Sequence, residues 1–361
     1  MPDLTPPFPS HLVLNDPRPW AFTTAELTAG LRRYTGDPTL VITDLKEQEI
    51  TQRRASMGRI RALDVKIQGA TGQNIFFLIH KEPQSTTRAG TAGQGLREAS
   101  FYRQLKDHIP VRVPVLFAAH PQGNWLVLER LDPGRLSEKW GRKEYLLAID
   151  QLVALHDRFW GLGQDLKAYN WLARPLDSDS DILIQAAKSA VEHMTKKGAN
   201  SLSQDTELIS ITKKIIKSTG KILKKLRNTF ATLLHGDYWP GNIHMHKNGT
   251  LTVYDWEQAA IGPGILDLVN FVQNSTWWIA PLPITVSEIT DHYRSRLMQA
   301  GSYSYEEEEW DMLWDHALLW TFIAEWVDLL SHMPDSMLNT RLPAINTVLL
   351  EPIKLAAKRR L

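Results

Sequence analysis

Three stretches near the start of the chain alternate apolar and polar residues or are rich in β-branched and aromatic residues: 40–51, 60–69 and 74–83. Alternation with a period of two is typical of strands that bury one face. Glycine-containing turns separate the three runs, so the sequence predicts an antiparallel meander. A short helix is expected before it, over 23–34, because Thr23 and Thr24 are suitable caps and Glu26 lies in the first turn.

A polar, Gly-rich segment at 83–95 is expected to form a surface loop. A helix is predicted after it over 96–109, and two further strands over 113–131, joined by a PQGN turn. Strand character stops at residue 131. We therefore expect an N-terminal lobe of residues 1–131, with an arm and helix over about 1–38, and a C-terminal lobe of residues 132–361.

Apolar residues recur at helical spacing through most of the second lobe. The predicted helices cover 143–160, 181–194, 208–230, 264–275, 285–300, 305–331 and 340–358. The lysines of the third helix are expected to form a solvated face rather than a nucleic-acid patch. Trp310 and Trp314 lie four residues apart and are expected in the core, with a wall of the substrate site as the alternative.

Composition narrows the class of partner. The chain has 41 Lys and Arg against 40 Asp and Glu, so no overall field favours nucleic acid or an anionic membrane. It has no cysteine, which excludes disulfides and thiolate chemistry. No basic segment followed by an apolar run opens the chain, and Glu325 and Asp328 interrupt its most apolar late window. We expect a soluble, cytoplasmic protein with a small-molecule partner.

The stretch 233–268, LLHGDYWPGNIHMHKNGTLTVYDWEQAAIGPGILDL, holds most of the candidate chemistry. Asp237 and Asn242 have the spacing of a kinase catalytic loop. The hypothesis assigns Asp237 to orienting the acceptor hydroxyl and accepting its proton, and Asn242 to binding a metal ion. The Asn-Gly turn at 248–249 predicts a hairpin that returns Asp255 to the side of Asn242, where both could bind Mg²⁺.

A lysine and a glutamate in the N-terminal lobe complete the predicted site. Lys81 ends a strand and Glu98 lies on the following helix, so an ion pair between them would hold the lysine on the nucleotide phosphates. Lys66, on the preceding strand, is the alternative lysine. Gly58 would let the first turn approach the phosphates closely.

Together these motifs resemble the aminoglycoside phosphotransferase and choline kinase family, and within it the ecdysteroid-kinase-like branch. HGDYWPGNI resembles the family's catalytic loop and YDWE its metal-binding segment, while GPGILDL, REASFYRQL and ALHDRFW resemble flanking segments. The resemblance covers residues 40–275. It implies an α+β, protein-kinase-like two-lobe fold, with an N-terminal antiparallel sheet and one helix, and a larger, mainly helical C-terminal lobe.

The resemblance also implies the roles of individual residues. It makes Asp237 and His235 catalytic and Asn242 and Asp255 metal ligands. Asp267 and Glu257 would support the site. The nucleotide, ATP with GTP as a further option, would be bound by Lys81, Glu98, Gly58, Ser56 and Glu129.

The expected function is an ATP- and Mg²⁺-dependent O-phosphotransferase acting on a small hydroxylated molecule, such as an antibiotic, an amino alcohol or another metabolite. One alternative is a kinase-like nucleotide-binding protein without activity. The other is a metal-dependent hydrolase with a zinc site formed by His235, Asp237, His244, His246 and Asp255. The sequence leaves the acceptor, ATP against GTP, and the oligomeric state open.

Overall fold

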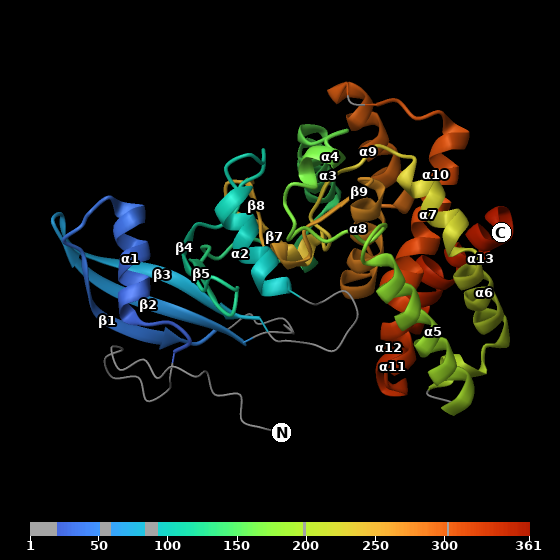
Figure 1. Ribbon diagram of the computed structural model, residues 1–361, viewed down its shortest axis with the longest axis horizontal. Helices are drawn as coiled ribbons and strands as arrows, with labels where there is room; N and C mark the ends of the chain where they lie inside the picture. The colour runs from blue at the N-terminus through green and yellow to red at the C-terminus, as the bar shows by residue number, and fades with distance from the viewer. Residues whose placement is uncertain (1–19, 51–58, 84–92, 198–199, 302) are drawn as a thin grey trace. The chain divides into compact units, whose positions relative to one another are not determined.

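The computed structural model describes residues 20–50, 59–83, 93–197, 200–301 and 303–361 (Figure 1). The predicted nucleotide-loop residues Ser56 and Gly58 lie outside these ranges. The chain divides into two compact units. The first draws its described residues from 1–87, 91–108 and 112–134, and the second consists of Ile109–Val111 and Arg135–Leu361. The functions assigned to the two lobes stay predictions.

An antiparallel sheet of five strands forms the first unit, in the order β1-β2-β3-β5-β4. Its strands are β1 Val41–Gln48, β2 Arg59–Gly69, β3 Gly72–Glu82, β4 Leu116–Ala119 and β5 Leu126–Glu129. The predicted meander of the first three strands is confirmed. Alternation along β2 explains it, since Leu63, Val65 and Ile67 are buried while Lys66 is exposed.

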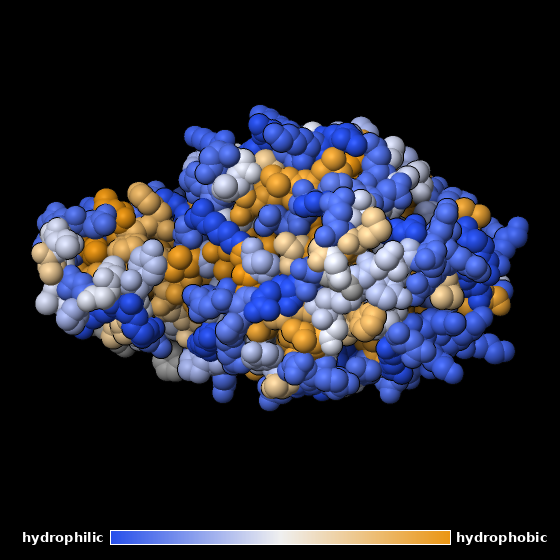
Figure 2. Space-filling model, turned by 90° about the horizontal axis from the view of Figure 1, so that it is seen from above, coloured by the Kyte–Doolittle hydropathy of each residue, from blue (hydrophilic) through white to orange (hydrophobic). Residues whose placement is uncertain are grey.

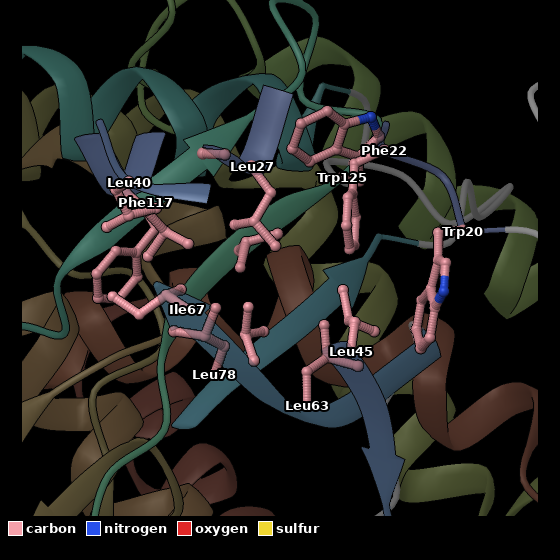
Figure 3. Close-up of a cluster of buried hydrophobic side chains, with 14 residues drawn as sticks. Trp20, Phe22, Leu27, Leu40, Leu45, Leu63, Ile67, Leu78, Phe117 and Trp125 are labelled. Carbon is pink, nitrogen blue, oxygen red and sulfur yellow. The ribbon is translucent and has the colours of Figure 1, made fainter. Parts of the chain in front are cut away.

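The helix α1, Thr24–Thr35, packs on one face of this sheet. It begins where predicted, because the Thr23 hydroxyl accepts from the Glu26 N–H and the Glu26 carboxylate accepts from the Thr23 N–H. Gly30 lets the helix approach β4, since a Cβ there would lie 2.0 Å from the Phe117 carbonyl oxygen. The helix and the sheet enclose a core, drawn in Figure 3, that includes Trp20, Phe22, Leu27, Leu63, Leu78 and Trp125.

The helix α2, Gln94–Gln104, lies on the other face of the sheet. Adjacent residues of β3 point to opposite faces. His80 contacts Trp20 and Phe22 on the α1 side, whereas Lys81 is bonded to Glu98 of α2. The alternation of β3 therefore sends the lysine toward α2.

The second unit is mainly helical, and several of its helices lie side by side in Figure 1. They are α3 Arg142–Arg158, α4 Gly163–Leu166, α5 Ser180–Lys197, α6 Thr206–Lys217, α7 Thr219–Arg227, α8 Ile265–Ile279, α9 Val286–Ala300, α10 Glu307–Thr321, α11 Val327–His332, α12 Asp335–Ile345 and α13 Glu351–Arg360. π-helical turns at Phe322–Trp326 and Asn346–Leu350 join α10 to α11 and α12 to α13.

One helix prediction was wrong in its continuity, because residues 208–230 form α6 and α7 rather than a single helix. The break falls at the run Ser218, Thr219 and Gly220, all poor helix formers, and the Thr219 hydroxyl donates to the Ile216 carbonyl. The six lysines of the two helices are exposed, as predicted: residues 213, 214, 217, 221, 224 and 225. Trp310 is buried in the core, also as predicted.

The helix α8 is the buried centre of the second unit, and α9, α10 and α12 contact it. Two small antiparallel sheets precede it in the chain. One pairs β6, Thr232–Leu234, with β9, Ala260–Gly262; the other pairs β7, Ile243–Met245, with β8, Leu251–Val253. The stretch singled out in the sequence therefore consists of two nested strand pairs that lead into α8.

Polar side chains dominate the face of the protein seen in Figure 2, with smaller hydrophobic patches among them. Among the residues that the structure describes, no helix is both long and apolar enough to cross a membrane.

Candidate active site

The catalytic-loop motif follows β6 directly and turns sharply at Gly236. This glycine has a φ of 84°, in the left-handed region that residues with a side chain rarely adopt. A Cβ at the same position would lie 2.1 Å from the Gln258 carbonyl oxygen. Only glycine fits this turn, and the turn brings Asp237 out of the strand.

His235 is fully buried beside Asp237. Its Nδ1 accepts from the Asp237 N–H over 3.2 Å, and its Nε2 donates to the Tyr254 carbonyl over 3.0 Å. The ring also packs against Trp256 at 4.5 Å between centroids. The two ring nitrogens thus tie the loop to the segment that carries Asp255, which is the arrangement of a positioning residue.

Asp267 braces the loop from α8. Its Oδ2 accepts from the His235 N–H over 2.8 Å, and its Oδ1 from the Gly236 N–H over 2.9 Å. His156 Nε2 lies 3.2 Å from Oδ2 and is held in turn by the Tyr293 hydroxyl at 2.8 Å. Asp267 and His156 are both completely buried. These bonds fix the peptides on either side of the turn, as the sequence motif predicts.

The predicted hairpin between Asn242 and Asp255 is confirmed, with His244 opposite Thr252 in its register. The Tyr254 N–H donates to the Asn242 carbonyl over 3.0 Å, so the chain returns to the catalytic loop one residue before Asp255. Alone among the described non-glycine residues, Asp255 has a positive φ, of 68°. Backbone strain of this kind is frequent at functional sites.

Two amides hold the Asp237 carboxylate from different sides. Asn242 Nδ2 donates to Oδ2 over 2.7 Å and also to the Asp237 carbonyl over 2.9 Å. Asn274 Nδ2, from α8, donates to Oδ1 over 3.1 Å. Since the Asn242 amino group faces Asp237, its side-chain oxygen faces away and can serve as a ligand.

Burial and neighbouring negative charges raise the pKa of Asp237 to about 8, mainly through desolvation and then through repulsion from Asp255, Glu325 and Glu257. The site therefore holds more negative charge than its own cations offset. An excess of carboxylates with an amide oxygen beside them is the environment that a hard divalent cation prefers. The residues present fit Mg²⁺, and Asn242 and Asp255 would be its protein ligands.

Sequence reasoning missed three residues of the site. Asn270 Nδ2 donates to the Gly236 carbonyl over 3.1 Å and to Glu325 Oε1 over 3.2 Å. Glu325 lies in the π-helical turn after α10, a type of distortion that is frequent at functional sites. Asn274 is the third. Helical spacing from Asp267 could have identified the two asparagines, because positions 267, 270 and 274 share one face of α8.

The predicted ion pair of the first unit is present. Lys81 Nζ lies 2.7 Å from Glu98 Oε2, and both side chains are buried. The alternative lysine, Lys66, is half-exposed and pairs with Asp44 at the surface. Burial thus separates the two candidates, and its role toward a nucleotide stays a prediction.

Two other predicted residues have local partners. Glu129, at the end of β5, accepts from the Val115 N–H over 3.2 Å and pairs with Arg112 at 3.2 Å. Glu257, in the short turn after Asp255, contributes to the negative charge that Asp237 experiences. A contact of either residue with a ligand stays a prediction.

The five-residue zinc set of the hydrolase hypothesis is not brought together. The His244 and His246 rings contact each other, and His246 Nε2 is 2.7 Å from the Thr252 hydroxyl. Within the described part of the chain, no cluster of metal-type ligands joins either of these histidines to Asp237 or Asp255. The histidines follow the hairpin rather than the catalytic loop.

Comparisons with known proteins agree with this geometry. A family model described as a phosphotransferase enzyme family matches residues 84–313, more than half of the chain. No curated protein is a significant match.

Solved structures with a similar fold include a Plasmodium vivax ethanolamine kinase, with 13% identity, a TM-score of 0.55, and coverage of 86% of this chain and 83% of that one. Choline kinase LicA from Streptococcus pneumoniae has 13% identity, a TM-score of 0.47, and coverage of 85% and 94%. A macrolide 2′-phosphotransferase from Brachybacterium faecium has 15% identity, a TM-score of 0.46, and coverage of 88% and 97%. The predicted α+β fold class is confirmed.

Proposed function

Because this chain belongs to the phosphotransferase enzyme family, we propose that it is a nucleotide-dependent kinase that phosphorylates a hydroxyl group of a small molecule, with Mg²⁺ as its cofactor. The family gives the reaction class, transfer of a phosphoryl group to an alcohol. The nucleotide, the metal ion and the acceptor are parts of the proposal. The similar ethanolamine and choline kinases act on amino alcohols by their names, and that substrate class is open for this chain.

The observation that carries the proposal is the way in which Asp237 is held. Its two carboxylate oxygens accept from Asn242 and Asn274, so the group has one orientation. Its raised pKa, about 8, makes it a stronger base than a free aspartate. A base that is fixed and basic in this way suits removal of a proton from an acceptor hydroxyl as the hydroxyl oxygen attacks phosphorus.

The remaining roles follow from the contacts around Asp237. Asn242 and Asp255 would bind Mg²⁺, which when present offsets the charge of the nucleotide phosphates. Lys81, held by Glu98, would contact those phosphates. We assign His235 to positioning rather than to proton transfer, because both ring nitrogens are engaged with the backbone of Asp237 and Tyr254.

The test is a nucleotide-consumption screen with ATP or GTP and Mg²⁺ over hydroxylated metabolites and antibiotics, read out by a mass increase of one phosphate on the product. Asp237→Asn and Asp255→Ala are expected to lose turnover and keep the unfolding transition of the wild type. Asp165→Asn, an exposed change on α4, is the matched control. Near-normal turnover in either site variant contradicts the assignment. Nucleotide binding without turnover on any acceptor would favour the binding protein instead.

A further inference from the structure

One face of α8 carries four residues whose spacing of three, four and four places them in a row: Asp267, Asn270, Asn274 and Trp278. The first three hold the catalytic loop through the bonds described above. Trp278 is one turn beyond Asn274, which is about 6 Å further along the helix. The row therefore leads from Asp237 to Trp278.

Trp278 is exposed over 42% of its surface, although it is a large apolar residue. Trp239, two residues after Asp237 in the catalytic loop, is stacked on it, with 6.1 Å between ring centroids and 24° between ring planes. Trp277 beside it is buried and packs against Trp326 at 5.1 Å. The two stacked rings form a supported flat apolar surface next to the catalytic aspartate, which suits a flat ligand.

Arg341 of α12 completes this surface. Its guanidinium lies 5.6 Å from the centroid of the Trp278 ring, and Nη1 donates to the Trp277 carbonyl over 2.7 Å. A guanidinium has five N–H donors. Among the described residues, no carboxylate forms an ion pair with Arg341. The arginine thus presents donors beside the two rings.

The charge of Arg341 decides what chemistry fits here. A ligand cation would normally bind over a tryptophan face, but the guanidinium already lies over Trp278 and would repel it. A carboxylate or phosphate, in contrast, can accept two parallel hydrogen bonds from a guanidinium. The bonding preference at this end of the site is therefore anionic.

We propose that Trp239, Trp278 and Arg341 form an aromatic shelf that binds the acceptor, and that the acceptor is a hydroxylated molecule with a flat ring and an anionic group. The inference rests on the proposed function, because it assigns the shelf to the acceptor of Asp237. A hydroxyl held at Asp237 places the ring on the two tryptophans and the anion at Arg341.

The experiment compares three probes that differ only in charge: 4-(hydroxymethyl)benzoate, its methyl ester, and 4-(aminomethyl)benzyl alcohol. Calorimetry measures their binding, and nucleotide consumption measures their turnover. The wild type is expected to bind the acid best. Arg341→Gln is expected to weaken binding of the acid by about tenfold or more, the effect of a lost charged hydrogen bond, and to leave the ester nearly unchanged. Trp278→Ala is expected to weaken both.

The matched control is Arg158→Gln, because Arg158 also lies over an aromatic ring, that of Phe159, without contact to the shelf. Preference of the wild type for the amine, or an acid-to-ester ratio that Arg341→Gln leaves unchanged, overturns the inference, as does a lack of binding of the acid at millimolar concentration. Calorimetry needs no turnover, so binding of the acid without phosphorylation of any acceptor supports the shelf while contradicting the proposed function. Turnover of other acceptors with no effect of Arg341→Gln contradicts the shelf alone.

Discussion

Asn274, in the middle of α8, donates a hydrogen bond from Nδ2 to Oδ1 of Asp237 over 3.1 Å. The two residues are far apart in the sequence, and the bond exists because α8 packs beneath the catalytic loop. With Asn242 on Oδ2, it leaves the carboxylate a single orientation.

Replacing Asn274 by Ala is expected to reduce kcat about 10- to 100-fold, because the base loses one of its two orienting bonds. Asn274 is partly exposed, so the free energy of unfolding should change little. Steady-state kinetics and urea unfolding measure the two quantities. Asn228→Ala, on the exposed end of α7, is the control. An unchanged kcat in Asn274→Ala would show that Asn242 alone orients the aspartate.

Asp267→Ala is expected to lower the free energy of unfolding by about 3 kcal/mol or more, since it removes the acceptor of two N–H groups and leaves them buried. Asp267→Asn keeps one acceptor oxygen and should cost less. Urea unfolding followed by circular dichroism measures both. A cost of Asp267→Ala no greater than that of an average surface change would mean that water replaces the carboxylate.

Lys81→Met is expected to weaken nucleotide binding about tenfold or more, through loss of a charged contact with the phosphates. Glu98→Gln should weaken it less and should also destabilise the fold, because it leaves the lysine charge buried without its partner. Titration calorimetry with ATP and Mg²⁺ is the measurement. Lys66→Met is the matched control, and a loss of binding there that equals the loss in Lys81→Met would reverse the choice between the two lysines.

His80 is expected to make the stability of the first unit depend on pH. It is fully buried, neither ring nitrogen makes a hydrogen bond, and desolvation with the charges of Arg61 and Arg59 holds its pKa well below 6.5. Glu82 Oε1 lies 3.6 Å from Nδ1, but it is paired with Arg61 at 2.6 Å.

The sign of the effect follows from proton binding. Below pH 6.5 the unfolded chain takes up a proton at His80 that the folded chain does not, so stability falls as the pH falls, by up to about 1.4 kcal/mol per pH unit. His80→Leu should remove this contribution, and His108→Gln, an exposed change, should not. Urea unfolding at pH 5, 6, 7 and 8 gives the slopes. Equal slopes in wild type and His80→Leu would contradict the prediction.

Much of the site could be predicted because its residues are close in the sequence. The spacing of Asp237 and Asn242 and the Asn-Gly turn at 248–249 determine a loop and a hairpin with little help from the rest of the chain. The same holds for α1, whose capping box joins Thr23 to Glu26. Local hydrogen bonds of this kind are encoded in a few neighbouring residues.

The second group of findings could not be read from the sequence. The choice between Lys66 and Lys81 depends on which face of the sheet α2 covers. The break between α6 and α7 depends on a weak helix run that a periodic pattern passes over. The π-helical turn that holds Glu325 leaves no mark in apolar spacing either.

The sequence by itself determined the reaction class and the order of the catalytic groups, since these lie within one short stretch. Only the tertiary structure decided what surrounds them: that Asn274 orients Asp237, that Asn270 joins Glu325 to the loop, and that Arg341 lies over Trp278. These contacts join helices separated by tens of residues. Their geometry comes from the packing of buried faces against one another, which fixes distances that no local spacing encodes.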